Sequence, residues 1–106
     1  MLRIAFREVR EEKVDRLRWW MGELSRRKTE VRETFLQEST RHEMAFLIRS
    51  KNGFILVYAM EVDDVEQAGR AFQASNLPID LEHKKIMREI TTGPVEAELL
   101  YECSVA

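Results

Sequence analysis

The sequence is poor in the residue types that most often mark a metal site, a disulfide scaffold or a phosphate loop. Among 106 residues it has one cysteine, two histidines, two prolines and four glycines. A lone cysteine excludes an intrachain disulfide and fits a reducing cytoplasm. Without HExxH or paired CxxC there is no metal signature, and the scattered glycines form no phosphate-binding loop. These absences argue against a disulfide scaffold, a motif-based metal site and a phosphate-binding loop.

Charge and hydropathy are also spread evenly. Seventeen Lys and Arg stand against nineteen Asp and Glu, which gives a net charge of -2, so we expect neither nucleic acid nor an anionic membrane as a partner. The longest apolar run, FILVYAM at 54–60, is far shorter than the roughly 18 residues of a spanning helix. MLRIAFREVR alternates and lacks the apolar core of a signal peptide. We therefore expect a cytoplasmic protein with a single domain over residues 1–106.

Periodicity predicts the elements of the first third of the chain. Residues 2–9 alternate, with Leu2, Ile4 and Phe6 on one side, as in a strand with one apolar face. From Glu11 the apolar residues follow helical spacing as far as residue 38. The basic run that ends at Lys28 suits a helix C-terminus. The sequence therefore predicts one long helix over 11–38, bent or broken near Lys28.

The remaining two thirds alternate strand and helix signals. Residues 42–62 form two strand-like runs around Asn52-Gly53, a type I′ hairpin signal because both turn residues need positive φ. Asp64 can cap a helix with Gln67 as its capping-box partner. Pro78 ends that region, and Asp80 is expected to cap a further helix to about residue 91. After Gly93-Pro94, residues 95–105 alternate as a last strand.

The order strand, helix, strand, strand, helix, strand predicts an α+β protein with the ferredoxin-like βαββαβ pattern, a four-stranded antiparallel sheet with helices on one face. Both faces of the hairpin are apolar. Phe54, Leu56, Tyr58 and Met60 lie on one face of 54–60, and Ile55, Val57 and Ala59 on the other. A sheet face without helices is normally polar, so we expect a second copy to cover it as a homodimer. The alternative is a monomer with an unusually apolar sheet.

A set of single residues carries a resemblance to a known superfamily. It consists of Trp20-Met21 with Leu24, Glu38, Glu43 and Phe46, Tyr58, and Asp80-x-x-His83. The chain resembles the dimeric α+β barrel superfamily and, within it, a family of short bacterial domains of unknown function. The resemblance implies a ferredoxin-like fold, a homodimer and a pocket between sheet and helices. The superfamily includes cofactor-independent or haem-dependent monooxygenases, isomerases and ligand-binding regulatory domains, so resemblance alone does not choose between enzyme and binder.

His83 is the candidate catalytic residue, because it interrupts the apolar stripe of Ile79, Ile86, Met87 and Ile90. With Asp80 as the N-cap, His83 would lie in the first helical turn, where the positive field favours a neutral ring. A neutral, inward-facing imidazole suits a general base or a hydrogen bond to a ligand. The competing interpretation is a buried, hydrogen-bonded and inert histidine, with Asp80 as a plain cap.

The other candidates are predicted to line the pocket. Glu43 shares a strand face with Ala45 and Leu47. It either faces water or points into the pocket, where it would pair with His83 or Arg7 and tune them. Tyr58 carries a hydroxyl on an apolar face. Trp20 is expected inside and Trp19 at an edge, and Cys103 as a small core residue rather than a nucleophile. His42 is expected to be exposed.

The sequence therefore predicts an uncharacterised homodimer that binds a small, partly apolar molecule, with Glu43, Tyr58, Asp80 and Trp20 as ligand-binding residues. Catalysis with His83 as the acid–base group is one possibility; a non-catalytic ligand-sensing or structural dimer is the alternative. The cofactor is unknown, and haem on His83 is supported only by a lone histidine. RNA recognition is not expected, because Ile55 and Leu56 occupy positions where a small residue and a stacking aromatic are needed.

Overall fold

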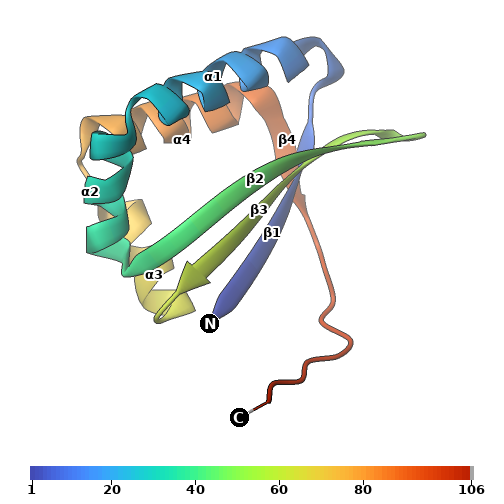
Figure 1. Ribbon diagram of the computed structural model, residues 1–106. Helices are drawn as coiled ribbons and strands as arrows, with labels where there is room; N and C mark the ends of the chain where they lie inside the picture. The colour runs from blue at the N-terminus through green and yellow to red at the C-terminus, as the bar shows by residue number, and fades with distance from the viewer. Residues whose placement is uncertain (106) are drawn as a thin grey trace.

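The computed structural model describes residues 1–105, which form a four-stranded antiparallel sheet partly enclosed by helices. The sheet order is β2-β3-β1-β4. The strands are β1 (Leu2–Val9), β2 (Thr40–Ser50), β3 (Gly53–Val62) and β4 (Thr91–Val95). The helices are the short 3₁₀ turn η1 (Glu11–Lys13), α1 (Val14–Arg26), α2 (Lys28–Glu38), α3 (Val65–Ala74) and α4 (Pro78–Ile90). Figure 1 shows the helices gathered on one side of the sheet and the other side open. The predicted α+β class and antiparallel sheet are confirmed.

The helix predicted over 11–38 is broken rather than continuous. The break lies at Arg27, whose backbone has φ -110 and ψ 43. Its N–H closes α1 on the carbonyls of Glu23 and Leu24, and its carbonyl accepts the N–H of Val31 in α2. Figure 1 shows α2 turning away from α1 along the side of the sheet. The break lets the two helices cover different parts of one twisted face, which a straight helix cannot do.

The hairpin is present, but its turn is shifted by one residue from the prediction. Ser50 pairs with Gly53, so Lys51 and Asn52 form the loop. Gly53 has φ 128, whereas Asn52 is not among the described residues with positive φ. The type I′ prediction was therefore wrong. The glycine enters β3 with the backbone angle that other residues rarely adopt.

Helices α3 and α4 begin in two different ways. Asp64 caps α3 as predicted, because its Oδ1 accepts the N–H of Gln67 at 3.1 Å. Asp80, however, is not the cap of α4: the N-cap is Leu77 and Pro78 is the first helical residue. Proline suits that position because its φ is already helical and its missing N–H is not needed there. His83 therefore lies in the second turn, not in the first.

The C-terminal strand is the largest correction. The structure has β4 at Thr91–Val95, with Gly93-Pro94 inside the strand, and no regular structure over 96–105. Figure 1 shows this segment leaving the sheet on the side away from the helices. Cys103, predicted in the core, is exposed. A strand needs a hydrogen-bonded neighbour, and residues 96–105 pair with no strand of the described chain, so alternation alone did not produce one.

The core lies between the sheet and the helices, and Trp20 is at its centre with no exposed surface. Met21 and Leu24 pack against it, and Trp19 is 46% exposed, as predicted. His42 is exposed, also as predicted.

The sheet face that points away from the helices is uncovered. It presents apolar side chains from β1 and β2 that are 43% to 74% exposed: Leu2, Ile4, Met44, Phe46 and Ile48. The prediction that both faces are apolar is thus confirmed, and we name this surface the open face.

Candidate functional site

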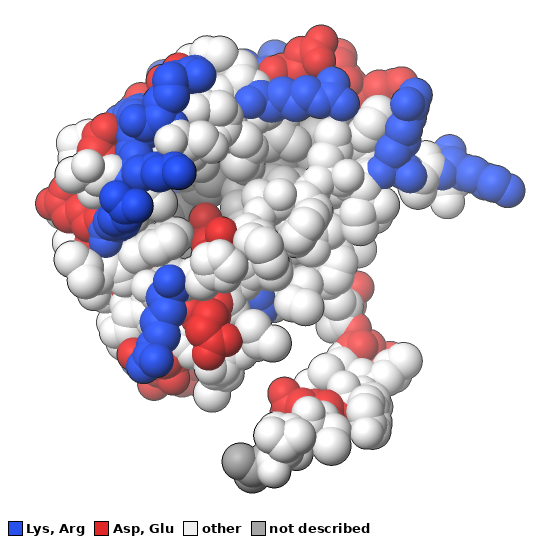
Figure 2. All heavy atoms as spheres, viewed as in Figure 1, with Lys and Arg blue, Asp and Glu red and all other residues white. Residues whose placement is uncertain are grey.

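A cavity of about 1060 Å³ lies between the inner face of the sheet and helices α2, α3 and α4. Specific ligand sites are on the order of 300–1,000 Å³, so the cavity matches a whole small molecule. Tyr58 of β3 lies opposite Ala5 of β1 and Ala45 of β2. The two alanines leave room on either side of the phenol ring. Figure 2 shows acidic side chains beside the hollow between the helical layer and β2, within a mostly uncharged surface.

Four of the five predicted site residues meet at this cavity. His83, Glu43, Tyr58 and Asp80 all line it. Trp20 lies behind His83 in the core and is not among the lining residues. The sequence prediction thus identified residues that the fold brings together from β2, β3 and α4, although the predicted reason for the placement of His83, a position in the first turn of α4, was wrong.

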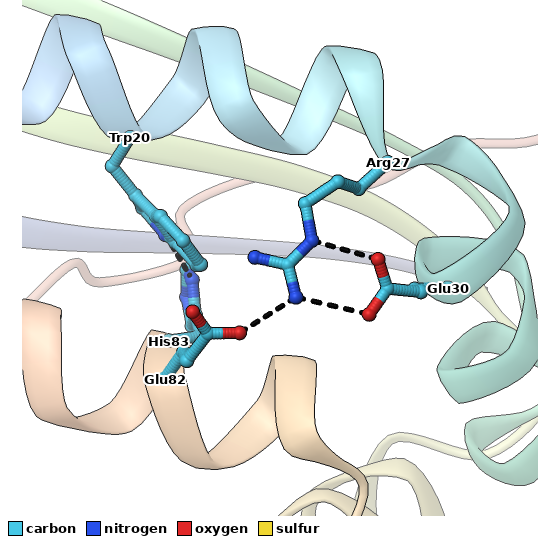
Figure 3. Close-up of polar contacts among 5 residues, drawn as sticks. All are labelled: Trp20, Arg27, Glu30, Glu82 and His83. Carbon is cyan, nitrogen blue, oxygen red and sulfur yellow. Dashed lines mark hydrogen bonds and ion pairs between the residues drawn. The ribbon is translucent and has the colours of Figure 1, made fainter.

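Both ring nitrogens of His83 are occupied. The Nε1–H of Trp20 donates to Nδ1 at 2.8 Å, and the hydroxyl oxygen of Tyr58 lies 3.2 Å from Nε2 (Figure 3 shows the Trp20 bond). Indole is a donor only, so Nδ1 carries no proton. Nε2 of the neutral ring must then be the N–H group, which donates to Tyr58. Burial lowers the pKa of His83 to about 4; Asp80 acts against this and Arg7 adds to it.

Tyr58 continues the chain of hydrogen bonds. Having accepted the proton of His83, its hydroxyl donates to Sδ of Met87 at 3.7 Å. Burial, and to a smaller degree the charge of Glu43, raises the pKa of this phenol far above its ordinary value. The series Trp20, His83, Tyr58 and Met87 is therefore neutral and fully paired. These four side chains hold one wall of the cavity in place and offer no free proton acceptor.

Asp80 is held by hydroxyl groups instead of capping its helix. It is 2% exposed, and its Oδ2 accepts from Thr34 and from Ser75, each at 2.5 Å. Each hydroxyl has one proton. The longer 3.4 Å contacts of the same hydroxyls, to Glu38 and to Gln37, therefore have no proton left to share. Asp80 joins α2, the loop before α4, and α4 in one buried contact.

Two further carboxyl groups in the cavity lack such donors. Glu43 makes no hydrogen bond or ion pair with any residue of 1–105, and Glu38 has only the long contact to Thr34. Burial raises the pKa of Glu43 to about 7, and Asp80 adds to the effect. Burial also raises the pKa of Glu38 to about 7; Asp80 and Glu43 add to it, while the positive charge of Arg3 opposes it. Both carboxyl groups therefore keep their protons to a higher pH than an exposed glutamate does.

A surface ion-pair group outside the cavity lining joins the α1–α2 break to α4. Arg27, at the α1–α2 break, donates to both carboxylate oxygens of Glu30 at 2.7 and 2.9 Å and to Glu82 of α4 at 2.6 Å (Figure 3). These hydrogen bonds raise the pKa of Arg27 and lower that of Glu30. The break is therefore tied to the helix that carries Asp80 and His83.

Sequence reasoning missed three contributors to the site: Thr34, Ser75 and, as a site residue, Glu38. A signal for two of them existed. Thr34 and Glu38 continue the buried stripe of Val31 at spacings of three and four, so a polar helix face toward the core was readable. Nothing in the spacing of Ser75 indicates its partner, because the bond to Asp80 depends on how the α3–α4 loop folds.

Over residues 1–105 no group of three or more His, Cys, Asp or Glu side chains is arranged to hold a metal ion. In the same part of the chain, no helix has both the length and the apolar character needed to cross a bilayer.

Comparison with known proteins gives one family match. Neither the curated proteins nor the solved structures include a match to this chain. A family model does match residues 3–106, which is nearly the whole sequence. The chain belongs to a family of unknown function, DUF6176.

Proposed function

We propose that the protein binds a small, partly apolar molecule in the cavity between sheet and helices, with Glu43 as the polar anchor. One observation carries the proposal: Glu43 lines the cavity with no hydrogen-bonding partner in residues 1–105. Glu43 is half-buried, and a carboxyl group that is partly removed from water without a hydrogen-bonding partner costs free energy. A ligand group that pairs with it recovers that cost, so binding is favoured at this point of the cavity.

The lining determines the kind of ligand. The cavity walls include Leu24, Val31, Phe35, Met60 and Phe72, which suit an apolar body. Glu43 and Glu38 present carboxyl groups that titrate near neutrality. They therefore suit a head group that donates hydrogen bonds, such as an amine or an amide, and a cationic amine would favour their ionised forms.

Proton transfer at the same site is a second candidate, and the raised pKa of Glu43 favours it. A general acid or base works best with a pKa near the operating pH, which Glu43 meets and His83 does not. The predicted acid–base role of His83 stays a prediction. Its contacts with Trp20 and Tyr58 favour the positioning of the cavity wall instead.

The assembly we propose is a homodimer of the dimeric α+β barrel kind. The strand order β2-β3-β1-β4, with helices on one side, agrees with the ferredoxin-like arrangement that the resemblance implies. The open face supports a second sheet as its cover, because contiguous exposed apolar patches of this kind mark interaction surfaces. A structural dimer without a ligand is the alternative, and it predicts an empty cavity with no binding.

A thermal-shift screen against amines, other metabolites and haem tests the binding proposal. Three variants sharpen it: Glu43→Gln removes the anchor, Gly69→Leu fills the cavity, and Glu33→Gln removes an exposed carboxylate of α2 as a control. No atom lies within 4 Å of a Cβ built on Gly69, which lines the cavity. Ligands that stabilise the wild type and Glu33→Gln should fail with the other two variants. Equal stabilisation of all four proteins would contradict the proposal.

A further inference from the structure

The segment 96–105 has the pattern of a strand and no strand partner. Ala97, Leu99, Tyr101, Cys103 and Val105 alternate with more polar residues except at Leu100. Leu99, Leu100, Tyr101 and Val105 are at least 76% exposed. Figure 1 shows the segment extended beyond β4, apart from the sheet and on the side of the open face. An exposed run of this composition is typical of a segment that is buried only in an assembly.

The sheet has two edges where a further strand can add. β4 pairs with β1 only from Phe6 to Val9, so the stretch Leu2–Ala5 of β1 is uncovered on that side. β2 is the other edge and is unpaired on its outer side along all of Thr40–Ser50. Unpaired edges are templates for strand addition. The edge of β2 matches the ten residues of 96–105 in length, whereas the uncovered part of β1 is only four residues long.

Charge and side-chain character also favour β2. The segment 96–105 contains Glu96, Glu98 and Glu102 and no lysine or arginine. Arg49 and Lys51, at the hairpin end of β2, make no ion pair within residues 1–105. Met44, Phe46 and Ile48 are 43% to 50% exposed on the open face of β2, so a strand added beside β2 with its apolar side on this face would contact them. An added acidic strand therefore meets basic residues at one end and apolar ones along its length.

We infer that residues 96–105 of one copy add as a strand to the β2 edge of a second copy, so that two chains exchange their C-terminal segments. The second copy is the occupant because the segment leaves its own sheet at Val95, beside β1 and at the opposite edge from its own β2. The exchange pairs the β2 edge of both copies at once, as two-fold symmetry requires. This inference rests on the proposed homodimer.

Cys103, the single cysteine, allows a direct test by disulfide trapping. Untagged wild-type chain is mixed with a tagged chain that carries Cys103→Ser and one new cysteine on β2: Met44→Cys, Phe46→Cys or Ile48→Cys. The control chain carries Cys103→Ser and Leu36→Cys, since Leu36 is 83% exposed on α2, far from the open face. After mild oxidation, we expect a mixed disulfide with at least one β2 position, at least tenfold above the control.

Each other outcome overturns the inference in a distinguishable way. Equal trapping at β2 and at Leu36→Cys indicates random collision. A disulfide within one monomer, in a chain that holds both Phe46→Cys and Cys103, places the segment on its own sheet. If sedimentation shows a dimer but no β2 position is trapped, the exchange is wrong and the homodimer stands. If the wild type sediments as a monomer at micromolar concentration, the homodimer fails as well, while ligand binding by the cavity is judged by its own screen.

Discussion

The indole N–H of Trp20 donates a 2.8 Å hydrogen bond to Nδ1 of His83, and this bond joins α1 to α4 inside the core. It decides the proton position on the imidazole, because a ring nitrogen that accepts an N–H has no proton of its own. The remaining N–H then points to Tyr58, 3.2 Å away. The bond thus keeps the imidazole of His83 neutral and fixed in place between the rings of Trp20 and Tyr58.

Trp20→Phe removes this donor while keeping an aromatic ring. Nδ1 of His83 is left without a partner, which costs about 1–3 kcal/mol of unfolding free energy, and the smaller ring adds a packing loss. Trp19→Phe is the matched control. Trp19 is 46% exposed with Arg16 over its ring at 4.4 Å, so its loss should stay below about 1 kcal/mol. Urea unfolding of both variants measures the difference; equal losses would show that the hydrogen bond contributes nothing.

His83 should not titrate near neutrality. Its pKa is lowered to about 4 by burial, so its ring signals should keep the shifts of the neutral form from pH 8 down to about pH 5. The chain has two histidines, and His42→Gln leaves His83 as the only source of imidazole signals in an NMR titration. A midpoint at or above pH 6 would refute the buried, neutral ring.

The same depressed pKa has a defined effect on stability. Between about pH 6.5 and 4 the unfolded chain binds a proton at this histidine and the folded chain does not, so His83 lowers stability as pH falls through that window, by up to about 1.4 kcal/mol per pH unit. His83→Gln should remove this contribution. Denaturant midpoints measured across that window should fall more steeply with decreasing pH for the wild type than for His83→Gln. If the variant is the less stable protein at pH 7, the two midpoints should converge at low pH.

Glu43 should act in the opposite direction. Its folded pKa is raised from 4.5 to about 7, so the folded state keeps a proton that the unfolded state has lost. The stability that Glu43 contributes is therefore complete below about pH 4.5 and is lost as pH rises to about 7. Relative to the wild type, Glu43→Gln should gain up to about 1.4 kcal/mol per pH unit across that window.

Thermal or urea unfolding at pH 5, 6, 7 and 8 measures this difference. Glu33→Gln, which removes an exposed carboxylate of α2, accounts for the loss of one negative charge. A difference between wild type and Glu43→Gln that stays flat beyond that control would mean that Glu43 is ionised throughout and faces water.

The hydroxyl groups of Thr34 and Ser75 should be energetically coupled to the charge of Asp80. Thr34→Val or Ser75→Ala removes one of the two donors to a carboxylate that is 2% exposed, and each loss should cost about 1.5–3 kcal/mol. In an Asp80→Asn background the same changes should cost less, because the acceptor is then neutral. A double-mutant cycle on unfolding free energies measures the coupling. Equal costs in both backgrounds would show that the hydroxyls do not serve the charge of Asp80.

The sequence by itself determined the elements that depend on local pattern. The alternation of 2–9 became β1, the strand-like runs of 42–62 became the hairpin, and Asp64 capped α3. The helical stripe placed Trp20 inside and left Trp19 partly exposed. These features follow from the side-chain periods of strands and helices and from caps formed within a few residues, and both are written in the sequence.

Only the tertiary structure decided which polar groups are paired and which are not. Asp80 reads locally as a cap, yet Pro78 begins the helix and two hydroxyls from other segments take the carboxylate. His83 reads as a free base until Trp20, 63 residues earlier, occupies its nitrogen. Glu43 and Glu38 gain their raised pKa from burial that no single segment creates. The alternation of 95–105 did not become a strand within the chain, because a strand requires a neighbour as well as a pattern.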